Sequence, residues 1–145
     1  MKALTISQPF ASLIVEGEKR FENRTWECHY RGNLAIHAGK GTQYLTRKEL
    51  LAYPTSKIIG VCNVVDCIHV MEAREAVIRE QSLGRFPWQT LEVFLKDKHF
   101  EGPFAIVLDD IAKLDSPIEI PGAQGLWNVP QQFIAKLEAE LPVPF

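Results

Sequence analysis

The sequence lacks the cysteine pattern of a secreted or zinc-binding protein. It has three cysteines, an odd number, and none of them forms a C-x-x-C pair. Neither a disulfide framework nor a zinc ribbon is therefore expected, and a reducing compartment suits the chain best. Cys62 and Cys67 lie in one strand-like segment at a spacing that puts their thiols on opposite faces, which does not suit zinc. We expect no metal and no cofactor.

Long apolar runs are also missing. No segment reaches the roughly 18 apolar residues that a membrane span needs. The N-terminus, MKALTISQPF, turns polar too early for a secretory signal. These absences predict a soluble, cytoplasmic protein with no membrane partner.

Several common active-site motifs are absent. The chain contains neither G-x-S-x-G nor H-E-x-x-H, which excludes the serine-hydrolase elbow and the zincin helix. Gly39-Lys40-Gly41-Thr42 is similar to the end of a phosphate-binding loop, but the earlier glycine of that loop is missing. A P-loop nucleotide hydrolase is therefore excluded as well.

The chain as a whole has no large excess of positive or negative charge, but each of its halves does. The net charge is −2, which argues against a strongly basic nucleic-acid module. Residues 1–60 nevertheless carry nine Lys and Arg against five Asp and Glu, whereas residues 61–145 carry seven against 13. An anionic ligand is expected to meet the N-terminal half, unless these charges are simply solvated side chains.

The apolar content is sufficient for one domain. The chain has 145 residues, of which 46% are hydrophobic, so a single domain over 1–145 can bury a core. Strands are predicted from apolar alternation and short apolar runs, and helices from 3.6-residue spacing with caps. The expected strands are 2–6, 21–26, 33–38, 58–70, 104–108, 111–120 and 126–129. The expected helices are two turns before Gly17, 47–51 opened by a capping box of Thr46 and Glu49, 71–82, 87–98 and the residues after Pro130.

The order of these elements favours an α+β fold. Strands 21–26 and 33–38 flank Tyr30-Arg31-Gly32, whose glycine suits a turn, so they are expected to form a hairpin or meander. The helices around 71–98, separated by Gly84-Arg85-Phe86-Pro87, resemble an insertion. No β–helix–β alternation supports a doubly wound sheet, so we expect a small β-barrel, mixed or antiparallel, with peripheral helices.

The segment 17–24 reads GxKxxExR and gathers two cations around a carboxylate. Strand alternation puts Glu22, Arg24 and Trp26 on one face, and Lys19 lies at the turn before them. In one interpretation the cluster is a salt bridge that braces a turn. In the other, Glu22 orients one cation while the second meets a phosphate or carbonyl, and a desolvated Lys19 serves as a base. Trp26 is then either a core residue or a stacking platform.

Further candidates for ligand binding stand outside this segment. Arg31 offers a cation on a turn, and Lys40 extends the basic character. His37 lies in an apolar strand, where a histidine is more often a hydrogen-bonded interior or rim residue than a catalyst. Trp127 follows a glycine-containing loop and offers an aromatic wall. Ser7-Gln8-Pro9 is expected to cap the first helix, with its proline in the first turn.

Three segments together resemble the ASCH domain family of the PUA-like superfamily. They are the run 7–14 (SQPFASLI), the segment Gly17-x-Lys19-x-x-Glu22-x-Arg24-x-Trp26, and the run 30–38 (YRGNLAIHA). The resemblance implies a small PUA-like β-barrel with a cleft lined by GxKxxExR, and binding of RNA or other nucleic acid. Some small bacterial relatives deacetylate acetylated cytidine, and nuclease activity is also ascribed to the group. In the deacetylating branch the motif lysine is the base, a threonine stands where this chain has Glu22, and a downstream glutamate matches Glu72 or Glu75 only by rough position.

Three hypotheses follow from the residues and the resemblance together. In the first, the chain binds RNA or a nucleotide-like ligand, with Trp26 or Trp127 as a wall. In the second it is an amidohydrolase with Lys19 and Glu22 as its catalytic residues. In the third it is a ribonuclease or a purely structural, partner-binding domain. The full set of candidate ligand-binding residues is Gln8, Lys19, Glu22, Arg24, Trp26, Arg31, His37, Lys40 and Trp127.

Overall fold

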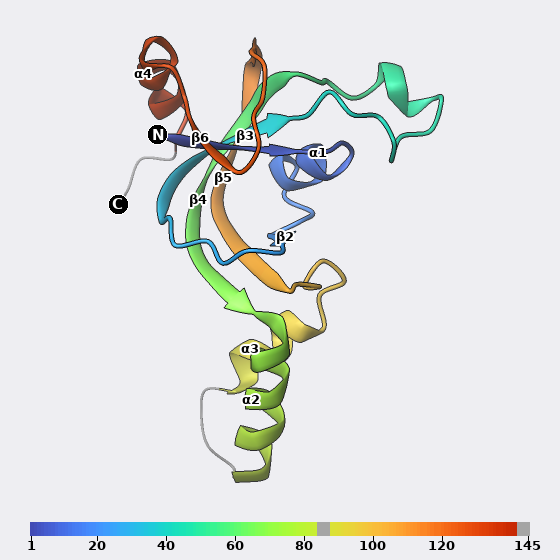
Figure 1. The fold of residues 1–145 in the computed structure, drawn as a ribbon, viewed down its shortest axis with the longest axis vertical. Helices are drawn as coiled ribbons and strands as arrows, with labels where there is room; N and C mark the ends of the chain where they lie inside the picture. Colours follow the sequence, from blue (N-terminus) through green and yellow to red (C-terminus); the bar gives the residue numbers. More distant parts are fainter. Residues whose placement is uncertain (84–87, 142–145) are drawn as a thin grey trace. The chain divides into compact units, whose positions relative to one another are not determined.

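The structure is a computed structural model that describes residues 1–83 and 88–141. The segment 84–87, where a break between two helices was predicted, lies outside the described residues. The elements, most of them labelled in Figure 1, are β1 (Lys2–Ile6), α1 (Phe10–Val15), β2 (Phe21–Arg24), β3 (Gly32–Ala38), the 3₁₀ turn η1 (Glu49–Leu51), β4 (Lys57–His69), α2 (Val70–Leu83), α3 (Trp88–Leu95), β5 (Phe104–Glu119), β6 (Leu126–Asn128) and α4 (Gln131–Ala139).

The strands form a mixed six-stranded sheet in the order β2-β5-β4-β3-β1-β6. β1 runs parallel to β3 and antiparallel to β6, and β2 runs antiparallel to β5. The predicted α+β class with a mixed sheet is therefore confirmed. The predicted hairpin of 21–26 with 33–38 is wrong, because β2 pairs with β5 while β3 pairs with β1.

The residues group into two compact units. The first contains 1–19, 32–63 and the described residues from 109 onward, and the second contains 20–31 and 64–108. Strands β4 and β5 contribute residues to both units. The prediction of a single domain over 1–145 stays a prediction.

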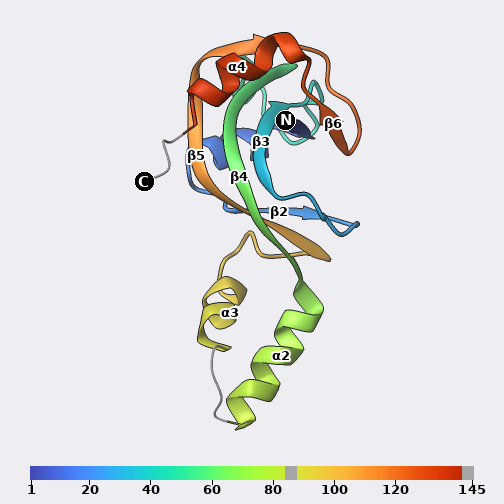
Figure 2. The ribbon, with the colours of Figure 1, turned by 90° about the vertical axis from the view of Figure 1, so that its left-hand side faces the viewer.

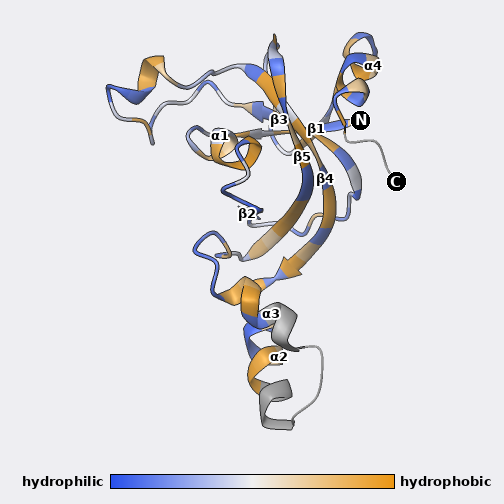
Figure 3. Cartoon of the chain, turned by 180° about the vertical axis from the view of Figure 1, so that it is seen from behind, coloured by the Kyte–Doolittle hydropathy of each residue, from blue (hydrophilic) through white to orange (hydrophobic). Residues whose placement is uncertain are grey.

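In the first unit, β1 lies between β3 and β6, and helix α1 packs close to β4. The core is built from small and branched apolar side chains on the strands and from α4; its buried members are Ala3, Ala35, Ile58, Val61, Leu114, Ile118, Val129 and Leu137. Gly60 of β4 is required for this packing, because a Cβ there would lie 2.4 Å from Cγ1 of Val15 in α1. Figure 3 shows the hydrophobic residues concentrated on α1, β4 and β5.

Helix α1 begins differently from the prediction. Its N-cap is Pro9, so the proline stands before the helix and not in its first turn. The side chain of Gln8 substitutes for the expected serine cap, since its Oε1 accepts the backbone N–H of Ser12 at 2.9 Å. Gly17, at φ +85, ends the helix as predicted, and its N–H is donated to the carbonyl of Ile14.

The second unit holds the helical pair α2 and α3, which lie side by side in Figures 1 and 2. The predicted helical region around 71–98 is thus confirmed for its described residues. Phe21 of β2 is buried there, with ring centroids 5.1 Å from Phe94 and 5.0 Å from Phe100. This aromatic cluster attaches β2, and with it the second half of the GxKxxExR segment, to the helical pair.

Two further strand predictions are corrected. The predicted strands 104–108 and 111–120 form one strand, β5, which passes through Asp110 at φ 50. The backbone N–H of Asp110 is donated to Oδ1 of Asp109, which holds this local irregularity. Strand β2 ends at Arg24, so Trp26 lies outside the strand whose face it was predicted to extend. None of the described helices is long and apolar enough to span a bilayer.

Candidate functional site

His37 stands at the centre of a chain of hydrogen bonds in the first unit. The register of the parallel strands places Thr5 of β1 beside His37 of β3. Thr5 Oγ1 lies 3.2 Å from His37 Nδ1, and His37 Nε2 lies 2.6 Å from the carbonyl oxygen of Ile120. Trp127 of β6 donates its Nε1–H to Thr5 Oγ1 at 3.0 Å, and its ring meets the His37 ring edge-on at 5.4 Å.

The partners fix the proton positions on His37. A carbonyl only accepts, so Nε2 carries the hydrogen that bonds to Ile120. The indole N–H of Trp127 only donates, so Thr5 Oγ1 accepts it and offers its own hydrogen to His37 Nδ1. The neutral imidazole satisfies every one of these bonds, and a second proton on Nδ1 would meet a hydroxyl that already accepts from Trp127. Burial lowers the pKa of His37, although the bond to Ile120 acts in the opposite direction.

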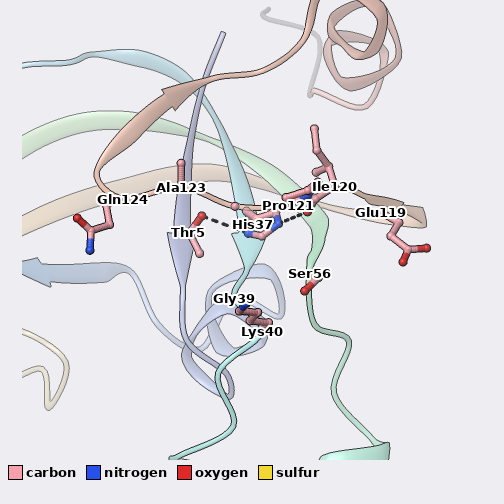
Figure 4. Close-up of a pocket in the computed structure, with 11 residues that line it drawn as sticks. Thr5, His37, Gly39, Lys40, Ser56, Glu119, Ile120, Pro121, Ala123 and Gln124 are labelled. Atoms are coloured by element: carbon pink, nitrogen blue, oxygen red, sulfur yellow. Dashed lines mark hydrogen bonds between the residues drawn. The ribbon is translucent and has the colours of Figure 1, made fainter.

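These bonds hold one wall of a pocket of about 500 Å³, shown in Figure 4. In that view His37 bridges Thr5 and Ile120, and Lys40 and Ser56 are drawn below the ring. The wall is the segment 119–124, which consists of the last residue of β5 and most of the connection to β6. The lining residues are Thr5, His37, Gly39, Lys40, Ser56, Glu119, Ile120, Pro121, Gly122, Ala123 and Gln124.

Gly122 is the point where this wall touches the histidine. A Cβ on Gly122 would lie 2.5 Å from Thr5 Oγ1 and 2.7 Å from His37 Cε1, far inside contact distance. Only a glycine therefore allows the wall to close over the Thr5 and His37 pair without a shift. The close approach of the Gly122 backbone to the His37 ring therefore shapes the pocket.

The pocket carries both signs of charge and several hydrogen-bonding groups. Lys40 and Glu119 are exposed at its border, and Gln124 and Ser56 add an amide and a hydroxyl. A cation beside an apolar hollow suits a ligand that joins an anionic group to a flat or apolar body. Of the predicted candidates, the structure thus brings together His37, Lys40 and, through Thr5, Trp127.

Lys19 lies in the same unit and is only 4% exposed. Its ammonium nitrogen is 5.9 Å from the ring centroid of Phe10, an arrangement in which the ring face favours the cation. The Phe10 ring in turn meets Tyr44 edge-on, with centroids 5.4 Å apart. Lys19, Phe10 and Tyr44 therefore form a row of contacts, with the lysine at the buried end and the exposed tyrosine at the other.

Gln8 is the fifth predicted candidate in this unit, and its side chain is completely buried. Its Nε2 donates to Ser12 Oγ and to the carbonyl of Pro54, both at 2.8 Å, and its Oε1 accepts from Ser12. The amide thereby joins the start of α1 to the segment before β4. The predicted ligand contact of Gln8 stays a prediction, since its described bonds are all internal.

The remaining candidates lie in the second unit. Arg24 Nη2 donates to Glu22 Oε2 at 2.9 Å, which confirms that the two residues share a strand face. Arg31 turns back onto its own turn, where Nη1 donates to the carbonyls of Cys28 and Tyr30. Its Nη2 also lies 3.7 Å from Asp66 Oδ1. Trp26 is partly exposed. The binding roles predicted for these four residues are not tested by the structure.

No group of three or more His, Cys, Asp or Glu side chains among the described residues is arranged to hold a metal ion. All three cysteines are free, and burial raises the pKa of Cys62 to about 12. Burial also raises the pKa of Cys67. Cys62 is therefore a core residue with an unreactive thiol.

Sequence reasoning missed the residues that complete the pocket, above all Thr5 and Gly122. The signal for Thr5 was weak: a hydroxyl in an otherwise apolar strand. Gly122 was predicted only as part of a loop. Both depend on pairing between distant segments, which no local pattern contains.

The model of the ASCH domain family matches residues 4–112 of the chain. Activating signal cointegrator 1 of Mus musculus is 33% identical over 88 residues, covering 50% of this chain, and its Homo sapiens counterpart is 31% identical over the same length. The matched region is 15% of the length of each of these relatives.

Two solved structures are similar over nearly the whole chain. The crystal structure of ASCH from Zymomonas mobilis gives a TM-score of 0.55 at 17% identity, covering 97% of this chain and 95% of that one. A point mutant of the same Zymomonas mobilis protein gives 0.55 at 19% identity, covering 97% and 98%. At these identities the similarity shows the fold, and it confirms the predicted fold class.

Proposed function

The chain belongs to the ASCH domain family, and we propose that it binds RNA or a nucleotide, with the pocket lined by His37 and Lys40 receiving one nucleotide. The pocket volume of about 500 Å³ falls within the range of small-molecule sites, roughly 300–1,000 Å³. Similarity to activating signal cointegrator 1 covers a limited part of that protein, so its own partners are not transferred to this chain.

One observation carries the proposal: the exposed Lys40 borders a pocket that is also lined by the loop segment 121–124. Lys40 supplies charge for a phosphate, and the segment 121–124 lines the pocket together with His37, so that its backbone can offer hydrogen-bonding groups to a ligand (Figure 4). The edges of an unpaired base are read by such groups in single-stranded RNA. His37 itself is occupied by Thr5 and Ile120, so we assign it to positioning the wall.

Lys19 supplies a second cation on the same unit, in keeping with the expectation that GxKxxExR takes part in binding. Its ammonium group is held against the Phe10 ring. A lysine in this setting meets an incoming phosphate with little loss of side-chain freedom. Lys19 is thus assigned to the positive charge of this unit, together with the pocket cation Lys40 in the proposal.

The test is a binding titration with a fluorescein-labelled, single-stranded RNA of mixed sequence at several salt concentrations. We expect Lys40→Gln to weaken binding and to reduce the salt slope by about 0.7 to 1. Lys136→Gln, which removes an exposed lysine from α4, is the matched control and should bind like the parent chain. A parent chain that binds no RNA at low salt would refute the proposal.

A second candidate function rests on the burial of Lys19. Lys19 is a buried residue, only 4% exposed, and its side-chain nitrogen lies 5.9 Å from the centroid of the Phe10 ring, so a lysine of the kind that serves as a base stands in a sheltered position. The reaction would be hydrolysis of the amide of acetylated cytidine. Incubation with acetylcytidine should release cytidine and acetate, and Lys19→Ala should abolish the release. No turnover by the parent chain would exclude this substrate.

A further inference from the structure

The segment between β3 and β4 projects from the first unit, as Figure 1 shows between the cyan and green strands. Hydrogen bonds hold it in a defined shape. The N–H of Leu45 is donated to the carbonyl of Thr42 at 3.0 Å, and Thr46 and Glu49 cap one another reciprocally, as the sequence predicted. In Figure 3 this segment is mostly hydrophilic with one hydrophobic stretch. It is an ordered projection with its own surface chemistry.

Tyr44 is the exposed aromatic residue of this projection. Its side chain is 58% exposed, yet its ring is held edge-on by Phe10, with an interplanar angle of 64°. A ring that packs against Phe10 and is still more than half exposed has already lost part of the freedom that stacking would cost. Such a ring provides a surface on which a nucleic-acid base stacks, whatever the sequence.

Positively charged residues stand on both sides of Tyr44 in the sequence. The segment 40–53 contains Lys40, Arg47 and Lys48 against one carboxylate, Glu49. Glu49 is already engaged, because its Oε1 accepts the backbone N–H of Thr46 at 2.9 Å. The capping interaction thereby keeps the carboxylate at its own turn, next to two exposed cations. The surface is complementary to a phosphate backbone.

The projection is continuous with the proposed site at two points. Lys40 begins the segment and lines the pocket. Phe10 contacts Tyr44 on one side and Lys19 on the other. The projection is thus linked to the pocket through Lys40 and to the motif lysine through Phe10.

Given the proposed function, we propose that the ligand is a single-stranded oligonucleotide, with one base stacked on Tyr44 and the adjoining phosphates held by Arg47 and Lys48. A duplex keeps its bases stacked on each other and offers no free face to a tyrosine. In this proposal an isolated nucleotide occupies the pocket without engaging Tyr44, Arg47 or Lys48. The length and strandedness of the ligand are thus set by residues outside the pocket.

The experiment compares a labelled ten-nucleotide single strand, the corresponding duplex and a labelled mononucleotide. For the single strand, we expect Tyr44→Ala to weaken binding roughly tenfold and Tyr44→Phe to preserve it, because the ring alone is needed. Arg47→Gln with Lys48→Gln should weaken binding and reduce the salt slope by about 1.4. None of these changes should alter mononucleotide binding. Leu51→Ala, which trims a 98% exposed side chain on the same projection, is the control and should bind normally.

The outcomes separate this inference from the proposed function. If the parent chain binds single strands but Tyr44→Ala and the double variant bind equally well, the inference is wrong and the pocket proposal stands. Equal affinity for the duplex would also overturn it. If the parent chain binds none of the three probes, both are refuted. Circular dichroism of Tyr44→Ala should match that of Tyr44→Phe, which separates a loss of stacking from a disturbed Phe10 contact.

Discussion

His37 Nε2 donates its hydrogen to the carbonyl oxygen of Ile120 across 2.6 Å, although the two residues are 83 positions apart. This bond attaches the wall of the pocket to the third strand. The imidazole Nδ1, the Thr5 hydroxyl and the Trp127 indole continue the connection across β1 to β6. Three strands and the connection after β5 are thereby joined through one buried ring.

Thr5→Val tests the energetic weight of this connection. Valine keeps the shape of threonine but removes the hydroxyl, which leaves His37 Nδ1 and Trp127 Nε1 without that partner. We expect the free energy of unfolding to fall by about 1–3 kcal/mol. Urea denaturation measures it, and Thr42→Val, at an exposed position, should change it by less than about 0.5 kcal/mol. Equal effects of the two changes would contradict the connection.

The stability of the fold should depend on pH through His37. Its pKa is lowered in the folded state, mainly by burial. Below about pH 6.5 the unfolded chain therefore binds a proton that the folded chain still excludes, so acid favours unfolding. The stabilisation is complete above that pH and is lost as the pH falls towards the folded-state pKa.

Urea denaturation between pH 8 and pH 5 measures this dependence. His37→Gln should flatten it over the same interval, because no buried imidazole remains to be protonated. His29→Gln alters a side chain that is 82% exposed and should leave the dependence unchanged. A parental pH dependence in the His37 variant would show that other groups are responsible.

Gly122→Ala should disturb the pocket wall. The added Cβ would meet Thr5 Oγ1 at 2.5 Å and the His37 ring at 2.7 Å, so the wall or the ring must move. We expect a loss of about 1–3 kcal/mol in stability and weaker RNA binding. Gly41→Ala is the control, since its Cβ would meet only the flexible end of Gln43. If Gly122→Ala bound RNA and unfolded like the parent chain, the close packing of Gly122 against Thr5 and His37 would be ruled out.

Gln8→Leu separates an internal role from a ligand contact. The change keeps the size of the side chain but removes its bonds to Ser12 and Pro54 at a completely buried position. We expect the free energy of unfolding to fall by roughly 2–4 kcal/mol. Gln43→Leu, at an exposed position, should have little effect. Unchanged stability together with lost RNA binding would assign Gln8 to the ligand instead.

The elements that local patterns determine were predictable from the sequence. Apolar runs marked β1, β3 and the long strand β4, and Gly17 correctly marked the end of α1. The reciprocal cap of Thr46 and Glu49 was also predicted, because both partners lie within one turn. Each of these features depends on residues close together in the chain.

The features that failed depend on distant partners. Strands 21–26 and 33–38 read as a hairpin because a glycine stands between them, yet β2 finds its partner in β5. Asp110 at φ 50 lets β5 continue where the pattern indicated two strands. In the same way His37 and Lys40 were recognised as candidates, but Thr5, Gly122 and the wall of the pocket emerge only from the register of β1 with β3.

The placement of β1 has a consequence for protein synthesis. Its residues pair with β3 on one side and with β6 on the other, where Lys2 lies opposite Asn128. Because β6 is synthesised long after β1, one edge of β1 stays uncovered until translation has passed Asn128. Until then this bare edge is open to pairing with other chains, so a chain that ends before β6 would be prone to aggregation.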